Sequence, residues 1–248
     1  MMRFIRIVRS ASIPFSVAAL LTVGLLVSPP TASAGAIAVS AFAGDADSGI
    51  SASNTYTHAI DLSGGGETIN GVVFTGGGNG NQPGLNYELE NAPNPFGGNN
   101  SALTGGAHTL TSSFYYGGVP TETLTLSGLT PGATYLFTSY EAAFGNAGGR
   151  YNTFTDGDGA SFIYDENLHG GTLVQDTFVA TGSTYTIGFT LLNSGNYAGD
   201  LGDPNTTTNG DSHHFYGFTN QLVPAPEPAS LVLFGLGSLG AFFCLRRR

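Results

Sequence analysis

The sequence predicts an all-β fold: an antiparallel, jelly-roll-like β-sandwich, flanked by an N-terminal signal helix and a C-terminal transmembrane helix. Three observations lead to this class. Several runs between residues 35 and 223 alternate between apolar and polar side chains, which is the period of a strand buried on one face. Stretches rich in glycine and asparagine separate these runs, and no segment of residues 35–223 has a sustained helical period. Each end of the chain instead carries an apolar run near a group of arginines.

The first 34 residues have the layout of a secretory signal peptide. Three arginines and no acidic residue precede an apolar stretch over residues 13–27, and two prolines follow it. Ala32 and Ala34 supply the small side chains that signal peptidase accepts, so we expect cleavage after Ala34. A permanent anchor is the alternative, but the stretch is short for a bilayer that needs about 20 apolar residues. The sequence therefore predicts that residues 1–34 engage the export machinery and signal peptidase.

Residues 35–223 form the predicted ectodomain, and nine of its segments have strand character. The clearest is residues 184–191, where Tyr185, Ile187 and Phe189 share one face and threonines and a glycine occupy the other. The nine segments are residues 35–42, 68–74, 85–89, 108–116, 121–126, 133–140, 172–179, 184–191 and 213–222. About nine strands in one domain favour two packed antiparallel layers.

One connection, over residues 127–135, has the pattern of a sandwich corner. Pro131 and Gly132 suit the central positions of a type II turn, since glycine tolerates the positive φ required there. Leu129 would close the edge of the core, and the Tyr135 hydroxyl would bond back to the turn. The pattern resembles the tyrosine corner of fibronectin-type and related sandwich domains, which implies an architecture and no ligand.

The C-terminal segment, residues 224–248, combines a proline-rich start with an apolar run and a basic end. The run over residues 229–245 has 17 residues without charge, which is at the short end of the range for a spanning helix. Arg246, Arg247 and Arg248 follow it, and arginine-rich ends stay on the cytoplasmic side. The sequence therefore predicts a membrane anchor with the ectodomain outside the cell.

The order of Pro226, Glu227 and Pro228, a glycine-containing apolar helix and an arginine cluster resembles the PEP-CTERM sorting signal. That resemblance implies an exported protein, held transiently in the membrane and processed near these three residues by an exosortase-type enzyme. It also implies bacteria that make extracellular polysaccharide. The same tail is called the ice-binding protein C-terminal domain, a name that describes the tail and not this ectodomain. Residues from about 55 to 220 resemble the β-sandwich ectodomains that precede such tails.

The charge of the ectodomain excludes nucleic acid as a partner. Arg150 is the one lysine or arginine of residues 35–223, against sixteen acidic residues. So acidic a surface repels phosphate backbones and attracts divalent cations. The single cysteine lies in the C-terminal segment, so the ectodomain has no disulfide, and its stability must come from packing or from a bound metal ion.

Asp156, Asp158 and Asp165 are the candidate ligands of a structural calcium ion. Alternating carboxylates in a glycine loop can supply the oxygen ligands that Ca²⁺ requires. The alternative is a set of solvated turn aspartates that bond their own backbone. The pair His213 and His214 is expected on a strand, where the two side chains point to opposite faces and cannot easily bind one metal ion.

Arg150, Tyr115 and Tyr116 are the candidate ligand-binding residues. Aromatic rings near glycine and asparagine loops can stack against a sugar, and Arg150 can bind a ligand or pair with a buried carboxylate. No motif singles out a catalytic nucleophile or a carboxylate pair. We therefore expect a non-catalytic surface or matrix protein associated with extracellular polysaccharide. The alternatives are a carbohydrate-binding module with a defined glycan site and, less favoured, a secreted hydrolase.

Overall fold

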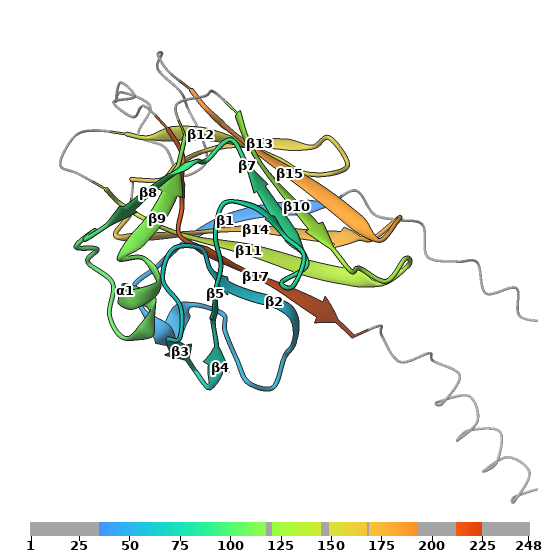
Figure 1. Cartoon of the computed structure of the whole chain (residues 1–248), viewed down its shortest axis with the longest axis horizontal. Coiled ribbons are helices and arrows are strands. Elements are labelled where there is room, and N and C mark those ends of the chain that lie inside the picture. Colours follow the sequence, from blue (N-terminus) through green and yellow to red (C-terminus); the bar gives the residue numbers. More distant parts are fainter. Residues whose placement is uncertain (1–34, 118–120, 145–148, 168, 193–211, 225–248) are drawn as a thin grey trace, which may run out of the picture. The chain divides into compact units, whose positions relative to one another are not determined.

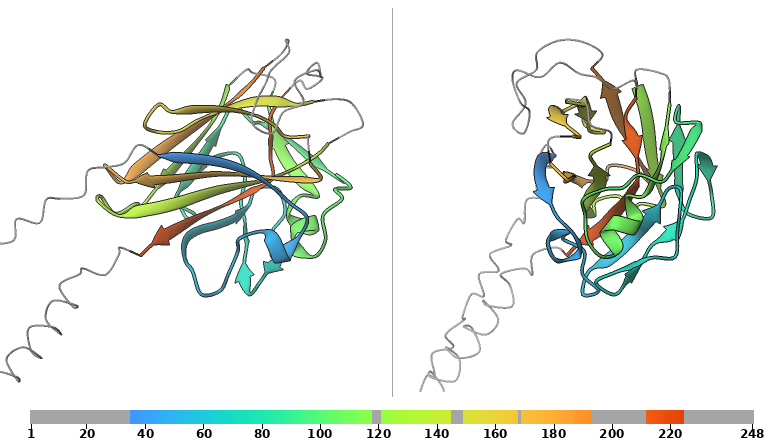
Figure 2. Two further views of the ribbon diagram at one scale, coloured as in Figure 1. Left: turned by 180° about the vertical axis from the view of Figure 1, so that it is seen from behind. Right: turned by 90° about the vertical axis from the view of Figure 1, so that its left-hand side faces the viewer.

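A computed structural model of the chain describes residues 35–117, 121–144, 149–167, 169–192 and 212–224. These residues build two six-stranded sheets that pack face to face as a β-sandwich (Figures 1 and 2). The all-β prediction is confirmed. Both predicted terminal helices fall outside the described residues, as do the signal-cleavage residues, the processing residues and the three terminal arginines. Within the described part of the chain, no helix has the length and apolar character that spanning a membrane takes.

The first sheet is antiparallel except at one edge, where β2 and β5 pair in parallel. Its strands, in spatial order, are β1 (Ala36–Phe42), β14 (Gly171–Val179), β11 (Thr134–Ala142), β17 (Gly217–Val223), β2 (Thr55–Asp61) and β5 (Thr75–Gly76). The C-terminal strand β17 therefore lies in the interior of the sheet, between β11 and β2. Its neighbours satisfy its backbone groups on both sides.

The second sheet is antiparallel throughout and faces the first. Its strands, in spatial order, are β13 (Ser161–Asp165), β12 (Tyr151–Thr155), β15 (Thr184–Leu191), β10 (Thr121–Ser127), β7 (Tyr87–Glu90) and β6 (Gly80–Gln82). The predicted alternation in β15 is confirmed, since Tyr185, Ile187 and Phe189 are buried in the core between the two sheets. Leucines and aromatic rings from both sheets complete that core.

Smaller elements gather beside one end of the sandwich, where Figure 1 labels β8, β9 and α1. One of them is a three-stranded sheet of β8 (Asn94–Gly97), β9 (Ser113–Tyr116) and β16 (His214–Phe215). Another is a hairpin of β3 (Thr68–Ile69) and β4 (Val72–Val73). The others are the helix α1 (Gly106–Leu110) and a 3₁₀ turn, η1 (Asp45–Asp47). A second hydrophobic core, with Phe114 and Tyr216 among its members, joins these elements to the sandwich.

Three predicted strands differ from the structure. Residues 108–116 divide into the end of α1 and strand β9, because the Asp45 carboxylate accepts hydrogen bonds from the first amides of the helix. Residues 68–74 form a tight hairpin, with Asn70 and Gly71 at φ values of 50° and 84°, as a two-residue turn of this kind requires. Residues 213–222 break at Tyr216, where the chain passes from the three-stranded sheet into the first sheet.

The predicted corner is confirmed in detail. Gly132 has a φ of 83°, and the Ala133 amide donates to the Thr130 carbonyl at 3.1 Å, which closes the turn. The Thr130 amide donates to the Tyr135 hydroxyl at 2.9 Å. Leu129 is buried at the edge of the core. The corner thus fixes the start of β11 against the loop that precedes it.

Candidate functional site

A buried cluster of acidic residues and histidines lies where both sheets meet the three-stranded sheet. Glu122 comes from β10 in the second sheet, Glu141 from β11 in the first, and Glu166 from the residue after β13. His213 is the residue before β16, and His214 is the first residue of that strand. All five side chains are between 0% and 3% exposed, so the cluster is sealed from solvent.

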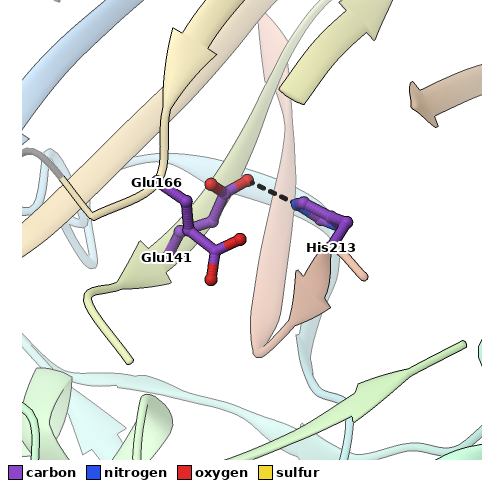
Figure 3. A group of neighbouring side chains, drawn as sticks. All are labelled: Glu141, Glu166 and His213. Carbon is purple, nitrogen blue, oxygen red and sulfur yellow. Dashed lines mark hydrogen bonds and ion pairs between the residues drawn. The ribbon is translucent and has the colours of Figure 1, made fainter. Parts of the chain in front are cut away.

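His213 bridges two of the carboxylates. Its Nε2 atom lies 3.1 Å from Glu141 Oε1, and its Nδ1 atom lies 3.5 Å from Glu122 Oε2 (Figure 3 shows the contact with Glu141). The imidazole ring stacks on Phe189 with a centroid distance of 4.4 Å and meets Phe215 edge-on. Aromatic packing therefore holds the ring in the plane in which each nitrogen faces one carboxylate.

Glu166 is held by the neighbouring histidine. His214 Nδ1 lies 2.7 Å from Glu166 Oε1, and the Asn152 amide donates to Glu166 Oε2 at 3.3 Å. Tyr164 donates to Glu141 Oε1 at 2.9 Å. His213 and His214 do pack against different aromatic rings, as expected for consecutive strand residues, and each reaches a carboxylate of the same cluster.

Burial and charge act in opposite directions on these groups. Burial by itself would lower the pKa of His213, but Glu141 and Glu122 outweigh burial and raise it to about 10. Burial raises the pKa of Glu122, and His213 opposes that rise. For Glu166, burial alone would raise the pKa, but His214 and Arg150 prevail and lower it. In the absence of another cation, the cluster is therefore an ion network around a protonated His213.

One side chain from each of three elements could supply a ligand to a metal ion. Glu141, Glu166 and His213 each offer one atom, and these atoms lie within 4.8 Å of one another. In Figure 3 the three side chains converge from different parts of the fold. The site therefore combines two carboxylates and one imidazole, which is a donor set for a divalent metal.

An aromatic pocket of about 230 Å³ opens beside this cluster. It is lined by Phe96, Phe114, Tyr116, Phe144, Arg150, Ser212 and His214. Phe96 stacks on Phe114 at a centroid distance of 5.0 Å, and Phe144 meets both rings edge-on. His214 lines the pocket and contacts Glu166, so one imidazole belongs to both the pocket and the cluster.

Arg150 is the positive charge of this pocket. Its guanidinium donates through Nη1 to the Ser212 carbonyl at 2.6 Å, while its Nε atom has no hydrogen-bond partner among the described residues. The side chain is 8% exposed. Arg150 thus lowers the pKa of Glu166 from one side and lines the pocket on the other. Both roles considered for it from the sequence, a buried charge partner and a ligand contact, are compatible with this position.

The structure separates the two candidate tyrosines. Tyr116 lines the aromatic pocket together with Arg150. Tyr115, the preceding residue of β9, packs against the core between the sheets, because neighbouring residues of a strand point to opposite faces. Of the three predicted ligand residues, the fold therefore brings Arg150 and Tyr116 together and directs Tyr115 elsewhere.

The candidate calcium residues lie at opposite ends of one hairpin. Asp156 sits in the turn between β12 and β13, where its Oδ1 atom accepts the amides of Asp158 and Ala160 at 2.9 and 2.7 Å. Asp165 ends β13 and accepts the Arg150 amide at 2.7 Å. Asp156 therefore has the hydrogen bonds of a turn aspartate. Calcium binding by Asp156, Asp158 and Asp165 stays a prediction.

Sequence reasoning did not single out Glu122, Glu141 or Glu166 as members of one site. A signal was present for the first two. Glu122 lies two residues from the inward-facing Leu124, and Glu141 lies four residues from Phe137, so each acid is on the same face of its strand as an apolar residue. An acid on the apolar face of a strand predicts a buried charge with a partner.

Fold and site together define an all-β sandwich protein with a buried carboxylate–histidine cluster beside an aromatic pocket. The PEP-CTERM protein-sorting motif matches residues 224–248, which begin directly after β17. The chain therefore carries a PEP-CTERM sorting signal and is an exported protein sorted to the cell surface by an exosortase. No curated protein sequence matches the chain.

Solved structures similar to the chain are β-rich. The extracellular domain of ANXUR2 from Arabidopsis thaliana has 10% identity and a TM-score of 0.46, with 68% of this chain and 49% of that one covered. The ANXUR1 extracellular domain, from the same plant, has 14% identity and a TM-score of 0.42, with coverages of 70% and 51%. An exo-β-1,3-galactanase from Phanerochaete chrysosporium has 13% identity and a TM-score of 0.31, with coverages of 62% and 31%. The chain spans about half the length of the two plant ectodomains.

Proposed function

We propose that this exported chain is a non-catalytic surface or matrix protein that associates with extracellular polysaccharide through the aromatic pocket. The observation that carries the proposal is the pocket itself, in which several aromatic rings meet the one arginine of the ectodomain. Flat apolar rings offer faces on which a sugar ring can lie, and a few polar groups among them fix its orientation. The sorting signal supports the proposal, because an exported domain can meet polysaccharide outside the cell.

The absence of catalysis is part of the proposal. Hydrolysis of a glycosidic bond requires two carboxyl groups that reach the substrate. The carboxylates of the cluster beside the pocket, Glu122, Glu141 and Glu166, are at most 1% exposed, and Glu166 contacts the pocket-lining His214. This burial favours binding over turnover at the pocket.

The proposal predicts that Phe96→Ala weakens polysaccharide binding at least tenfold. Phe96 is 37% exposed and stacks in the pocket, so its loss removes binding surface and little core. Affinity electrophoresis of the full chain in detergent, through gels containing neutral or uronic-acid polysaccharides, measures the change. Val73→Ala is the matched control, because Val73 is exposed and apolar but lies on the β3–β4 hairpin.

Two results would contradict the proposal. Retardation that is equal for the wild type and Phe96→Ala places the binding surface elsewhere, and no retardation by any polysaccharide removes the association. Release of reducing sugar ends during incubation would instead support the alternative of a secreted hydrolase.

A further inference from the structure

We propose that Glu141, Glu166 and His213 bind one divalent transition-metal ion, of the class of Zn²⁺ or Mn²⁺, inside the sandwich. This inference is independent of the polysaccharide proposal. Its ligands come from β11, from the residue after β13 and from the residue before β16, so the ion would connect three separate parts of the fold (Figure 3).

The spacing of the three side chains fits a single ion. One atom from each lies within 4.8 Å of the other two. Bonds of about 2.0–2.2 Å to nitrogen and oxygen place the ligands of one ion about 3–4 Å apart. His213 Nε2 and Glu141 Oε1 are already 3.1 Å apart. Binding therefore needs only a small contraction of the site.

The charge of the cluster also calls for a divalent cation. The cluster holds three buried carboxylates, Glu122, Glu141 and Glu166, and Arg150, the only lysine or arginine among the described residues, acts on Glu166. Negative charge is therefore in excess in the cluster, and uncompensated charge is unfavourable to bury. A divalent ion balances this excess while both histidines stay neutral.

An unused ligand atom points to the same conclusion. Glu141 Oε2 is fully buried and has no hydrogen-bond partner among the described residues. Buried polar atoms are nearly always paired in folded proteins. A carboxylate oxygen that is sealed in the core without a donor is therefore available to a cation.

The groups around the ligands orient them as metal sites require. His214 Nδ1 lies 2.7 Å from Glu166 Oε1, and the Asn152 amide donates to Glu166 Oε2. The Tyr164 hydroxyl donates to Glu141 Oε1. Such outer hydrogen bonds fix the direction of ligating carboxylates. The imidazole ligand excludes Ca²⁺, which takes oxygen ligands, and favours Zn²⁺ or Mn²⁺.

The test uses the full chain, purified in detergent without a histidine tag and stripped with a chelator. Titration with Zn²⁺ and with Mn²⁺ should show one bound ion by calorimetry. Saturation should raise Tm by about 5 °C or more, because an ion that binds only the folded state stabilises it. Elemental analysis of the unstripped protein reports which metal is bound as isolated.

Matched variants locate the site. Glu141→Gln and His213→Gln should each lose the bound ion and the rise in Tm, whereas Glu90→Gln and His108→Gln, outside the cluster, should keep both. Glu166→Gln provides a third ligand variant if one of the first two does not fold. If neither metal binds the wild type or shifts its Tm, the proposal is wrong and the cluster is an ion network around protonated His213. A response that the ligand variants retain also overturns it, because the ion then binds elsewhere.

Discussion

At the scale of single residues, Asp176 is an example of a carboxylate buried in the interior of this acidic domain. The side chain is buried on β14, accepts a hydrogen bond from the Tyr185 hydroxyl at 2.8 Å through Oδ2, and has no partner for Oδ1 among the described residues. Burial, with a further contribution from Asp156, raises the pKa of Asp176 to about 6. Asp176 thus holds its proton more tightly in the folded chain than in the unfolded chain.

The first residue-scale prediction concerns pH. Because the folded state binds this proton more tightly, the contribution of Asp176 to the free energy of unfolding falls as pH rises from about 4 to about 7. Asp176→Asn keeps an acceptor for Tyr185 and removes the titration. Denaturant unfolding at several pH values should show a flatter dependence, with a difference of the order of 2 kcal/mol across this range. Glu90→Gln, which removes a carboxylate from the surface, is the control for the change in charge. An equal slope for Asp176→Asn and wild type would contradict the assignment.

Tyr135 makes a second residue-scale prediction. Its hydroxyl accepts the Thr130 amide at 2.9 Å, and its ring stacks on Phe178 in the core. Tyr135→Phe keeps the ring and removes the hydrogen bond, so we expect a loss of about 1 kcal/mol in the free energy of unfolding. Chemical denaturation measures this loss, and Tyr115→Phe is the control on another strand. A Tyr135→Phe protein as stable as the wild type would show that the corner does not depend on the hydroxyl.

At the scale of elements, the short helix α1 depends on a carboxylate from a distant segment. Asp45, in η1, accepts the Gly106 and Ala107 amides at 3.0 and 2.8 Å. These amides have no partner within the helix, since the first turn of any helix leaves them free. The contact joins η1 to α1 across 61 residues of sequence.

Asp45→Ala should therefore destabilise the protein by about 1 kcal/mol, the usual cost of losing a helix cap. Thermal unfolding should show a lower Tm. Asp45→Asn, which keeps one acceptor oxygen, should recover part of the difference. Equal Tm values for wild type and Asp45→Ala would mean that the buried Ala107 and Leu110 side chains suffice to hold α1.

The same elements explain what the sequence could and could not predict. Alternation in β10, β11, β14 and β15 predicted the sandwich, because strands buried on one face must alternate. Residues 108–116 were predicted as one strand, but α1 occupies their first part, and its cap, Asp45, lies far away in the sequence. Tertiary contacts of this kind override local preference and leave no local pattern.

For the whole molecule, the candidate site was harder to predict than the fold. Glu122, Glu141, Glu166 and His213 come from four segments, and only the register of both sheets brings them together. Their strand parity indicated burial for Glu122 and Glu141, but parity cannot say which charges meet. Arg150 and Tyr116 were identified because basic residues are scarce and aromatic residues stand near glycine loops, and they do share a pocket.

The position of β17 affects how the ectodomain responds to mechanical load. The sorting motif begins at the residue after Val223, where β17 ends, so a force applied through residues 224–248 would enter the fold along this strand. Antiparallel partners β11 and β2 flank it on either side, and their hydrogen bonds run perpendicular to the strand axis. A pull on the tether therefore shears two ladders at once instead of peeling a single edge bond by bond.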